Sequence, residues 1–532
     1  MINIEVLNKA IALTQNGNIR EAEALYLKLL EEEPENYLIL SSLGLFYVNI
    51  QNFEKASEYL KKACDIKETA GTVSALGFAE FEKHNFKKSA EILEKALNLG
   101  ENPEIFNKLI LSLFQIKDYK KATEYSVKMY EKYPDNTNAI SHMVKALTQS
   151  GKLLEAEKLC VGYLRKHPDS ASLWFHLGFL KELIYSDDKQ ACECYKQALE
   201  LGNNEAYYNI AVSYQKQGNF EKAEEFYKKM LEVFPNDIET LTSLGMCYLS
   251  KKRFKDGYSL FFNRKTPVLE KYSHNPYKIN EKLAKEVVII CDQGFGDHIQ
   301  FIRYLPFLKE KVENFKVACP AQLKKLFEKN YPEFEFIDYT EINPDMQAIR
   351  ITDLAFILEK DFENIPFAEG YLNCESDKIQ SKKLKIGLCW EAGSAGIRTM
   401  INRTINIRLL EPIINFEDAE VFSFQVRDSM NGNERYPQMI NLAKDFKDFE
   451  STAKAMKNMD IIISVDTSVA HLAGALGVKT YLLLPYSNDW RWFDDTKTTP
   501  WYNSVEIFKQ TDPISWEKPI EDIICRLKEF SL

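Results

Sequence analysis

Amphipathic helices recur along the first half of the chain at a nearly constant spacing. Each copy has a polar turn, a bulky apolar residue, two polar residues and then a small residue, as in residues 17–22 and 218–223. Successive small residues are 32 to 35 positions apart, at 22, 56, 89, 122, 156, 191, 223 and 257. Unrelated helices would not keep this interval, so the pattern predicts stacked helix pairs.

Two further landmarks keep the same interval. In four copies a Leu-Gly pair precedes the small residue, and its glycines are Gly44, Gly77, Gly178 and Gly245. In four copies a proline ends the second helix, and these prolines are Pro34, Pro134, Pro168 and Pro235. Glycine on an inner helix face lets two helices approach closely, and proline stops a helix. We therefore expect an α-solenoid of about eight helix pairs over residues 1–265. Its last copy, with Gly257 as the small residue, is atypical, as terminal repeats are.

The pattern changes after residues 266–284, where Pro267 and Pro276 predict an irregular linker. Short β-branched runs then alternate with helical patterns, the first helix being predicted over about 297–311. The predicted strands are residues 287–290, 315–318, 385–390, 419–425, 460–464 and 480–484. This alternation is typical of a parallel α/β sheet and predicts two Rossmann-like lobes, residues 285–380 and 381–512, before a C-terminal helix in 513–532. A ligand cleft is expected between the lobes, at the carboxyl ends of the strands.

Composition and charge exclude several classes of protein. The formal net charge of −10 gives no basic surface, so no nucleic-acid partner is expected. No run of 18 apolar residues predicts a membrane span, and the first residues lack a signal-peptide pattern, so a cytoplasmic location is expected. Ten cysteines without a C-x-x-C pair argue against a zinc or redox site.

The turn after the first predicted strand of the second half carries the first candidate chemistry. Gly294 and Gly296 allow close approach of the backbone to a ligand, and a helix start favours negative charge. Asp297 follows in the first helical turn. Its carboxylate could face the cleft, or it could simply cap the helix.

A second candidate lies where the strand at 460–464 runs into a helix. Asp466, Thr467 and Ser468 form a polar cluster, with His471 one turn further on. Hydroxyls and backbone N–H groups at such a helix start can bind a phosphate, and His471 could reach the same anion. The alternative is an ordinary helix cap beside a partly solvated histidine.

A basic loop and an aromatic segment complete the candidates. Arg403, in the basic stretch 398–405, could clamp a phosphate or lie at the surface. Residues 485–493 and 500–502 gather tryptophans that could wall a ligand or pack the C-terminal tail. No Walker A loop, H-E-x-x-H, G-x-S-x-G or well-placed D-x-D motif is present, which excludes P-loop kinases, zincins and serine hydrolases and disfavours a D-x-D metal site.

Residues 285–512 resemble the GT-B glycosyltransferases, most closely the heptosyltransferase-like family and its relatives fused to tetratricopeptide repeats. The resemblance is carried by residues 294–306, 402–405, 422–425, 464–477 and 484–492. It implies that Asp297 is the general base and that Asp466, Thr467, Ser468 and His471 hold a nucleotide diphosphate. It also places Arg403 near the leaving phosphate and adds Asn402, Gln425, Gly294 and Gly296 to the nucleotide-sugar site.

The fusion of repeats to such a unit also resembles bacterial flagellin glycosyltransferases and, distantly, protein O-GlcNAc transferases. The function expected is inverting, metal-independent transfer of a sugar from a nucleotide sugar to Ser or Thr of a protein held by the repeats, with no cofactor. The acceptor could be flagellin, and the sugar a nonulosonic acid such as pseudaminic or legionaminic acid. Two alternatives stay open: an inactive repeat scaffold, and a transferase acting on a glycan or lipid.

Overall fold

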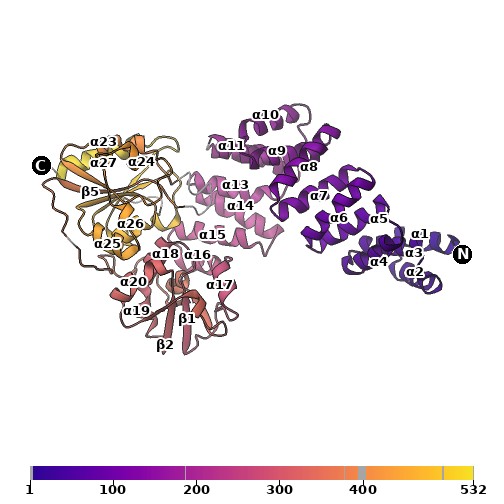
Figure 1. The fold of residues 1–532 in the computed structure, drawn as a ribbon, viewed down its shortest axis with the longest axis horizontal. Helices are drawn as coiled ribbons and strands as arrows, with labels where there is room; N and C mark the ends of the chain where they lie inside the picture. Colours follow the sequence, from indigo (N-terminus) through magenta and orange to yellow (C-terminus); the bar gives the residue numbers. More distant parts are fainter. Residues whose placement is uncertain (1–3, 186, 377, 394–402, 494–496, 531–532) are drawn as a thin grey trace. The chain divides into compact units, whose positions relative to one another are not determined.

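The computed structural model describes residues 4–185, 187–376, 378–393, 403–493 and 497–530. The chain forms two compact units (Figure 1). The first contains residues 1–185 and 193–203, and the second contains residues 186–192 and 204–532. The division between these two units falls inside the repeat region. The boundary predicted at residue 265 is a different one, because it marks where the helical periodicity ends.

The first unit consists of antiparallel helix pairs, which confirms the predicted repeat. The small residues are buried where the two helices of a pair meet, as Ala22, Ala56 and Ala122 show. A Cβ on Gly77 would lie 2.5 Å from Leu93, so glycine is required for this approach. The helices are α1 (Ile4–Gln15), α2 (Ile19–Glu32), α3 (Tyr37–Asn49), α4 (Phe53–Ile66), α5 (Ala70–Glu82), α6 (Phe86–Leu99), α7 (Pro103–Gln115), α8 (Tyr119–Lys132), α9 (Thr137–Gln149), α10 (Leu153–Leu164) and α11 (Ala171–Tyr185), and α12 (Asp188–Glu200) is shared between the units.

The second unit begins with the last two helix pairs, α13 (Ala206–Lys216) with α14 (Phe220–Val233), and α15 (Ile238–Ser250) with α16 (Phe254–Phe261). The predicted linker is more ordered than expected. It contains a short helix, α17 (Pro267–Tyr272), which begins at a proline, a residue favoured in the first turn of a helix. Pro276 then forms a parallel bridge to Ala348, so the segment runs along the following sheet.

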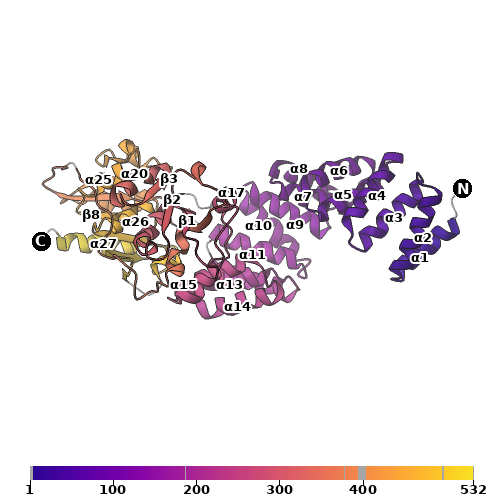
Figure 2. The same cartoon turned by 90° about the horizontal axis from the view of Figure 1, so that it is seen from below.

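The first lobe is built on a parallel sheet with the strand order β3-β2-β1-β4 (Figure 2). The predicted helix over 297–311 is wrong in extent, because α18 ends at Phe301 and a 3₁₀ turn precedes the short α19, whose second residue is Pro306. The pattern also missed β3 and β4, which are only three and four residues long. The elements are β1 (Glu286–Ile290), α18 (Phe295–Phe301), α19 (Leu305–Leu308), β2 (Asn314–Ala318), α20 (Ala321–Asn330), β3 (Glu335–Ile337), β4 (Gln347–Arg350) and α21 (Leu354–Ile357).

The second lobe has the strand order β10-β11-β9-β8-β5-β6-β7, parallel except for β10. The strand predicted over 419–425 ends at Ser423, and β11 was not predicted, because its polar residues Asn503, Ser504 and Glu506 interrupt the apolar run. The elements are β5 (Leu384–Cys389), α23 (Glu411–Ile414), β6 (Ala419–Ser423), α24 (Gly432–Arg435), β7 (Ile440–Asn441), α25 (Phe449–Met456), β8 (Ile461–Val465), α26 (Ser468–Ala475), β9 (Thr480–Leu484), β10 (Thr498–Thr499), β11 (Tyr502–Lys509) and α27 (Glu517–Phe530).

The last helix pair packs against both lobes. The ring of Phe254 in α16 lies 6.1 Å from that of Phe362 in the first lobe and 6.4 Å from that of Trp490 in the second. Arg264, just after α16, forms buried ion pairs with Asp292 at 3.0 Å and Asp353 at 2.8 Å. Leu249 and Phe261 belong to the same hydrophobic core as the lobes. The last repeat is therefore part of the α/β unit.

Among the described helices, none is both long and apolar enough to cross a bilayer.

Candidate functional site

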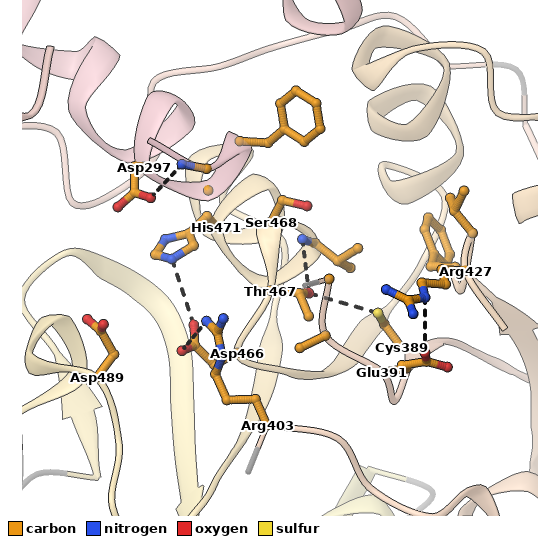
Figure 3. A pocket seen from close by; sticks show the side chains of 18 of the residues that line it. Asp297, Cys389, Glu391, Arg403, Arg427, Asp466, Thr467, Ser468, His471 and Asp489 are labelled. Carbon is orange, nitrogen blue, oxygen red and sulfur yellow. Dashed lines mark hydrogen bonds and ion pairs between the residues drawn. The ribbon is translucent and has the colours of Figure 1, made fainter. Parts of the chain in front are cut away.

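A cavity of about 680 Å³ lies between the two lobes, at the carboxyl ends of β1, β5, β6 and β8 (Figure 3). In the second lobe these ends flank the point where the strand order reverses, between β5 and β8, which is where such sheets bind ligands. Every predicted site residue except Asn402 lines the cavity: Gly294, Gly296, Asp297, Arg403, Gln425, Asp466, Thr467, Ser468 and His471. Asn402 lies outside the described residues.

Asp297 enters the cavity from the first lobe, and both of its oxygens are engaged. One accepts a hydrogen bond from the backbone N–H of Gly294 at 3.1 Å, so the carboxylate does cap α18. The other forms an ion pair with Arg491, which also holds Asp489 at 2.8 Å. Burial would lower the pKa of Arg491, but Asp297 and Asp489 outweigh it and raise that pKa above its ordinary value. Both predicted roles of Asp297, cap and cleft residue, are compatible with this geometry.

Arg403 lies against Asp466 in the second lobe, with Nη1 3.2 Å from Oδ2 (Figure 3). Burial raises the pKa of Asp466 above its ordinary value, although Arg403 opposes the shift. The arginine side chain is 22% exposed and lines the cavity, so the alternative of an ordinary surface arginine is wrong. An anion in the cavity would compete with Asp466 for this guanidinium.

His471 is a buried, neutral histidine, so the alternative of a partly solvated side chain is also wrong. Burial lowers its pKa to about 3. Its Nδ1 shares a hydrogen bond with Tyr502 at 3.0 Å and its ring stacks on Trp492. A Cβ on Gly296 would lie 2.7 Å from His471 Cδ2, so this glycine allows α18 to pack on α26. His471 can therefore hydrogen-bond a ligand but does not carry a positive charge near neutral pH.

The start of α26 faces the same cavity. Thr467 is the N-cap, and its hydroxyl accepts a hydrogen bond from the N–H of Val469 at 3.2 Å. Ser468, the first helical residue, lines the cavity. The partial positive charge of this helix start, together with Arg403 and Arg491, makes the cavity suited to a phosphorylated ligand.

Gln425 braces the loop after β5 rather than leaving its amide free. Its oxygen accepts hydrogen bonds from the N–H groups of Trp390 and Glu391 at 2.9 and 2.8 Å, and its nitrogen donates to the Glu391 carbonyl at 3.1 Å. Gln425 therefore positions the loop that lines the cavity, although the resemblance placed it among the ligand contacts.

Four charged residues of the cavity were not predicted as site residues: Glu391, Arg427, Asp489 and Arg491. Arg491 and Asp489 lie inside the segment 485–493, for which the sequence predicts only an aromatic wall or packing of the C-terminal tail. Glu391 is buried, and its carboxylate lies 3.6 Å from Arg427 and accepts the Ser429 N–H at 2.9 Å. An acidic and a basic residue two positions apart and interleaved with two tryptophans are the sequence signal that could have identified Asp489 and Arg491.

Within the described ranges, no three His, Cys, Asp or Glu side chains are grouped so that they could hold a metal ion. Metal-independent chemistry remains a prediction.

Family models match two stretches of the repeat region. A model described as tetratricopeptide repeat matches residues 205–237, and a second with the same description matches residues 7–70. The chain carries tetratricopeptide repeats. Protein FlbA of Caulobacter vibrioides is 22% identical over 462 residues, covering 77% of this chain and 76% of that protein. The repeats occupy residues 1–265 of the 532-residue chain, which is less than 77% of it, so this similarity extends into the α/β lobes.

Further similarities concern the repeats. The TPR repeat-containing protein MJ1428 of Methanocaldococcus jannaschii is 24% identical over 155 residues, covering 28% of this chain and a quarter (25%) of that protein. A solved tetratricopeptide repeat protein from Parabacteroides merdae covers 46% of this chain and 97% of its own, with 16% identity and a TM-score of 0.41. YrrB, described as a TPR protein with an unusual peptide-binding site, covers 41% of this chain and 96% of its own, with 21% identity and a TM-score of 0.26.

Proposed function

We propose that this chain is a glycosyltransferase with a GT-B arrangement of its two lobes, which transfers a sugar from a nucleotide sugar to Ser or Thr of a protein acceptor. The observation that carries the proposal is the cavity in which Asp297 of the first lobe faces Arg403, Asp466 and the start of α26 in the second. The resemblance assigns the general base to the first-lobe side of this cavity and the nucleotide diphosphate site to its second-lobe side.

The chemistry proposed is a single displacement with inversion. The acceptor hydroxyl attacks the anomeric carbon, a new C–O bond forms, and the bond to the phosphate oxygen breaks with its electron pair. The proton goes to Asp297. Arg403 and the N–H groups at the start of α26 stabilise the charge on the departing phosphate. No metal ion is required for this step.

The Asp297–Arg491 ion pair must open before Asp297 can act as a base. A nucleotide diphosphate offers Arg491 a competing anion, because guanidinium groups bind phosphate oxygens at least as readily as carboxylates. We therefore propose that the donor binds first and frees the carboxylate for the acceptor. This order couples deprotonation of the acceptor to the presence of the donor.

The repeats support a polypeptide as the acceptor, because tetratricopeptide repeats generally bind protein partners. Flagellin, modified with a nonulosonic acid, is the acceptor to test first, since the fusion resembles flagellin glycosyltransferases. The competing function is a scaffold without transferase activity. The observation that favours it is the same ion pair, which engages the proposed base.

Donor binding tests the proposal and separates it from the scaffold. The full chain is screened by thermal unfolding with CMP-, UDP-, GDP- and ADP-linked sugars. A donor at 100 times its dissociation constant should stabilise the fold by about 2.7 kcal/mol. Arg403→Ala should weaken this effect about tenfold or more in dissociation constant, while the exposed Lys285→Ala should not. If none of the four donor classes stabilises the chain, the scaffold is the better explanation.

A further inference from the structure

A second cavity, of about 510 Å³, lies on the first lobe beside the proposed catalytic cavity. Both cavities are lined by Gln293, Gly294 and Phe295, so they adjoin at the turn that leads into α18. The N–H of Gly294 is 3.1 Å from the carboxylate of Asp297. The second cavity therefore opens next to the proposed base.

The wall of this second cavity is largely apolar. On one side, α17 contributes Val268 and Tyr272. On the other side, the residues that follow β1, β2 and β3 contribute Cys291, Pro320 and Tyr339. The rings of Tyr272 and Tyr339 stack with their centroids 5.7 Å apart. Among the described residues of the wall, Lys271 is the only charged side chain at neutral pH. This chemistry suits an apolar or aromatic side chain and does not suit a phosphate or a polar glycan.

His298 also lines this cavity. Its Nε2 accepts a hydrogen bond from the N–H of Gln293 at 3.2 Å, and burial lowers the pKa of the imidazole to about 3. A neutral ring that accepts at Nε2 carries its proton on Nδ1. This Nδ1–H is buried and has no hydrogen-bond partner among the described residues.

Phe295 forms the boundary between the two cavities. Its side chain is 37% exposed, although it is aromatic and lies at the entrance to the site. It packs edge-on to His298 and against Phe449 of the second lobe, with ring centroids 6.4 and 5.0 Å away. An exposed aromatic ring at this position can contact a ligand that enters from either side.

We propose that the second cavity is a specificity pocket for the acceptor polypeptide. It receives an aromatic or large aliphatic side chain close in sequence to the modified Ser or Thr. Because the two cavities share the turn at residues 293–295, the anchoring side chain lies close in sequence to the hydroxyl, within about three positions for an extended chain. The acceptor role rests on the proposed function, whereas the binding of an apolar side chain does not.

Two variants on the same helix test the pocket. Val268→Phe places a ring in the cavity, and Glu270→Phe places the same residue on α17 where it does not line the cavity. The first probe is N-acetyl-phenylalanine amide, whose binding to the full chain is followed by ligand-observed NMR, with N-acetyl-glycine amide as reference. Wild type and Glu270→Phe should bind the phenylalanine probe, and Val268→Phe should not. Equal binding by all three proteins, or by none, overturns the proposal.

The second measurement uses nine-residue peptides with a central Ser in an Ala-Gly background, with or without a Phe within three positions. Transfer should be at least about tenfold faster for the best Phe peptide, and Val268→Phe should remove this preference without changing donor stabilisation. A donor that stabilises the chain together with transfer that ignores the Phe overturns the pocket and leaves the proposed function intact. Intact probe binding without stabilisation by any donor overturns the proposed function and with it the acceptor role.

Discussion

Asp297 is tied to the first lobe by a backbone N–H and to the second lobe by Arg491. The residues that line the cavity are arranged as cation–anion pairs, with Arg403 on Asp466 and Arg491 on both Asp297 and Asp489. Each arginine is buried or half-buried, and each can exchange a carboxylate for a phosphate. The chemistry of the site therefore depends on which anion each arginine holds.

Replacing Asp297 with Asn separates its capping role from its proposed chemistry. The amide oxygen can still accept the Gly294 N–H, so we expect the fold and donor binding to be retained. Transfer should fall by about 10²–10⁴-fold, the usual contribution of a general base. Asp345→Asn is the control, since that carboxylate is exposed on the same lobe. Undiminished transfer by Asp297→Asn, measured by mass spectrometry of the acceptor, would falsify the assignment.

Gly296 is expected to tolerate no side chain. An alanine Cβ would lie 2.7 Å from the ring of His471, which Tyr502 and Trp492 hold in place. Gly296→Ala should therefore destabilise the chain by about 1–3 kcal/mol and lower its Tm. Gly393→Ala is a matched control, because Gly393 lines the same cavity and no atom of the described residues lies within 4 Å of an added Cβ. Equal melting temperatures for the two variants would contradict the packing of α18 on α26.

Within the repeats, helix pairs are joined by buried polar contacts as well as by apolar packing. Glu80 of α5 is fully buried and accepts hydrogen bonds from Ser57 of α4, Asn85 and Lys88. Burial alone would raise the pKa of Glu80, but the hydrogen bonds from Lys88, Ser57 and Asn85 lower it to about 2. This carboxylate should therefore be charged in the folded chain at all ordinary pH values.

The depressed pKa of Glu80 predicts a pH dependence of stability. Its contribution is fully present above the ordinary glutamate pKa of 4.5 and is lost as pH falls toward 2, because the unfolded chain then binds the proton first. Glu80→Gln should remove up to roughly 2–3 kcal/mol of this pH-dependent stability of the first unit. Chemical denaturation at pH 7 and pH 3 measures the difference, with the exposed Glu58→Gln as control. The prediction fails if the stability difference between wild type and Glu80→Gln is the same at both pH values.

At the scale of the whole chain, the last two helix pairs and the α/β lobes form one compact unit. Phe254, Tyr258 and Phe261 cover Trp490, and Arg264 neutralises the buried Asp292 and Asp353. Removing them would expose aromatic surface and leave two buried carboxylates without this cation. The last repeat therefore completes the core of the lobes.

Truncation tests this division directly. A fragment of residues 204–532 should unfold cooperatively and keep any donor stabilisation seen with the full chain. A fragment of residues 266–532, cut at the boundary that the periodicity suggested, should aggregate or unfold without a cooperative transition. Calorimetry and size-exclusion chromatography distinguish the two results. A soluble, cooperatively folded 266–532 fragment would show that the last repeat is dispensable.

Local patterns in the sequence are enough to predict the repeat and much of the lobes. Helix pairs at an interval of 32 to 35 residues are specified by local periodicity, by glycines that allow close approach and by prolines that stop helices. The long apolar strands β1, β5, β8 and β9 were recognised for the same local reason, while the three-residue β3 and the polar-interrupted β11 were not. Asp297 and Asp466 could be singled out because each follows a strand and lies at a helix start.

Which of these residues meet, and with which partners, depends on the packing of the whole chain. Arg491 pairs with a carboxylate 194 residues earlier, and Arg264 pairs with Asp353 across 89 residues. No local pattern encodes such pairings, because they depend on how the sheets, α16 and α18 pack in space. The neutral state of His471 follows from its burial. The closeness of the two cavities at Gly294 follows from how the surrounding elements pack. Both are properties of the packed molecule.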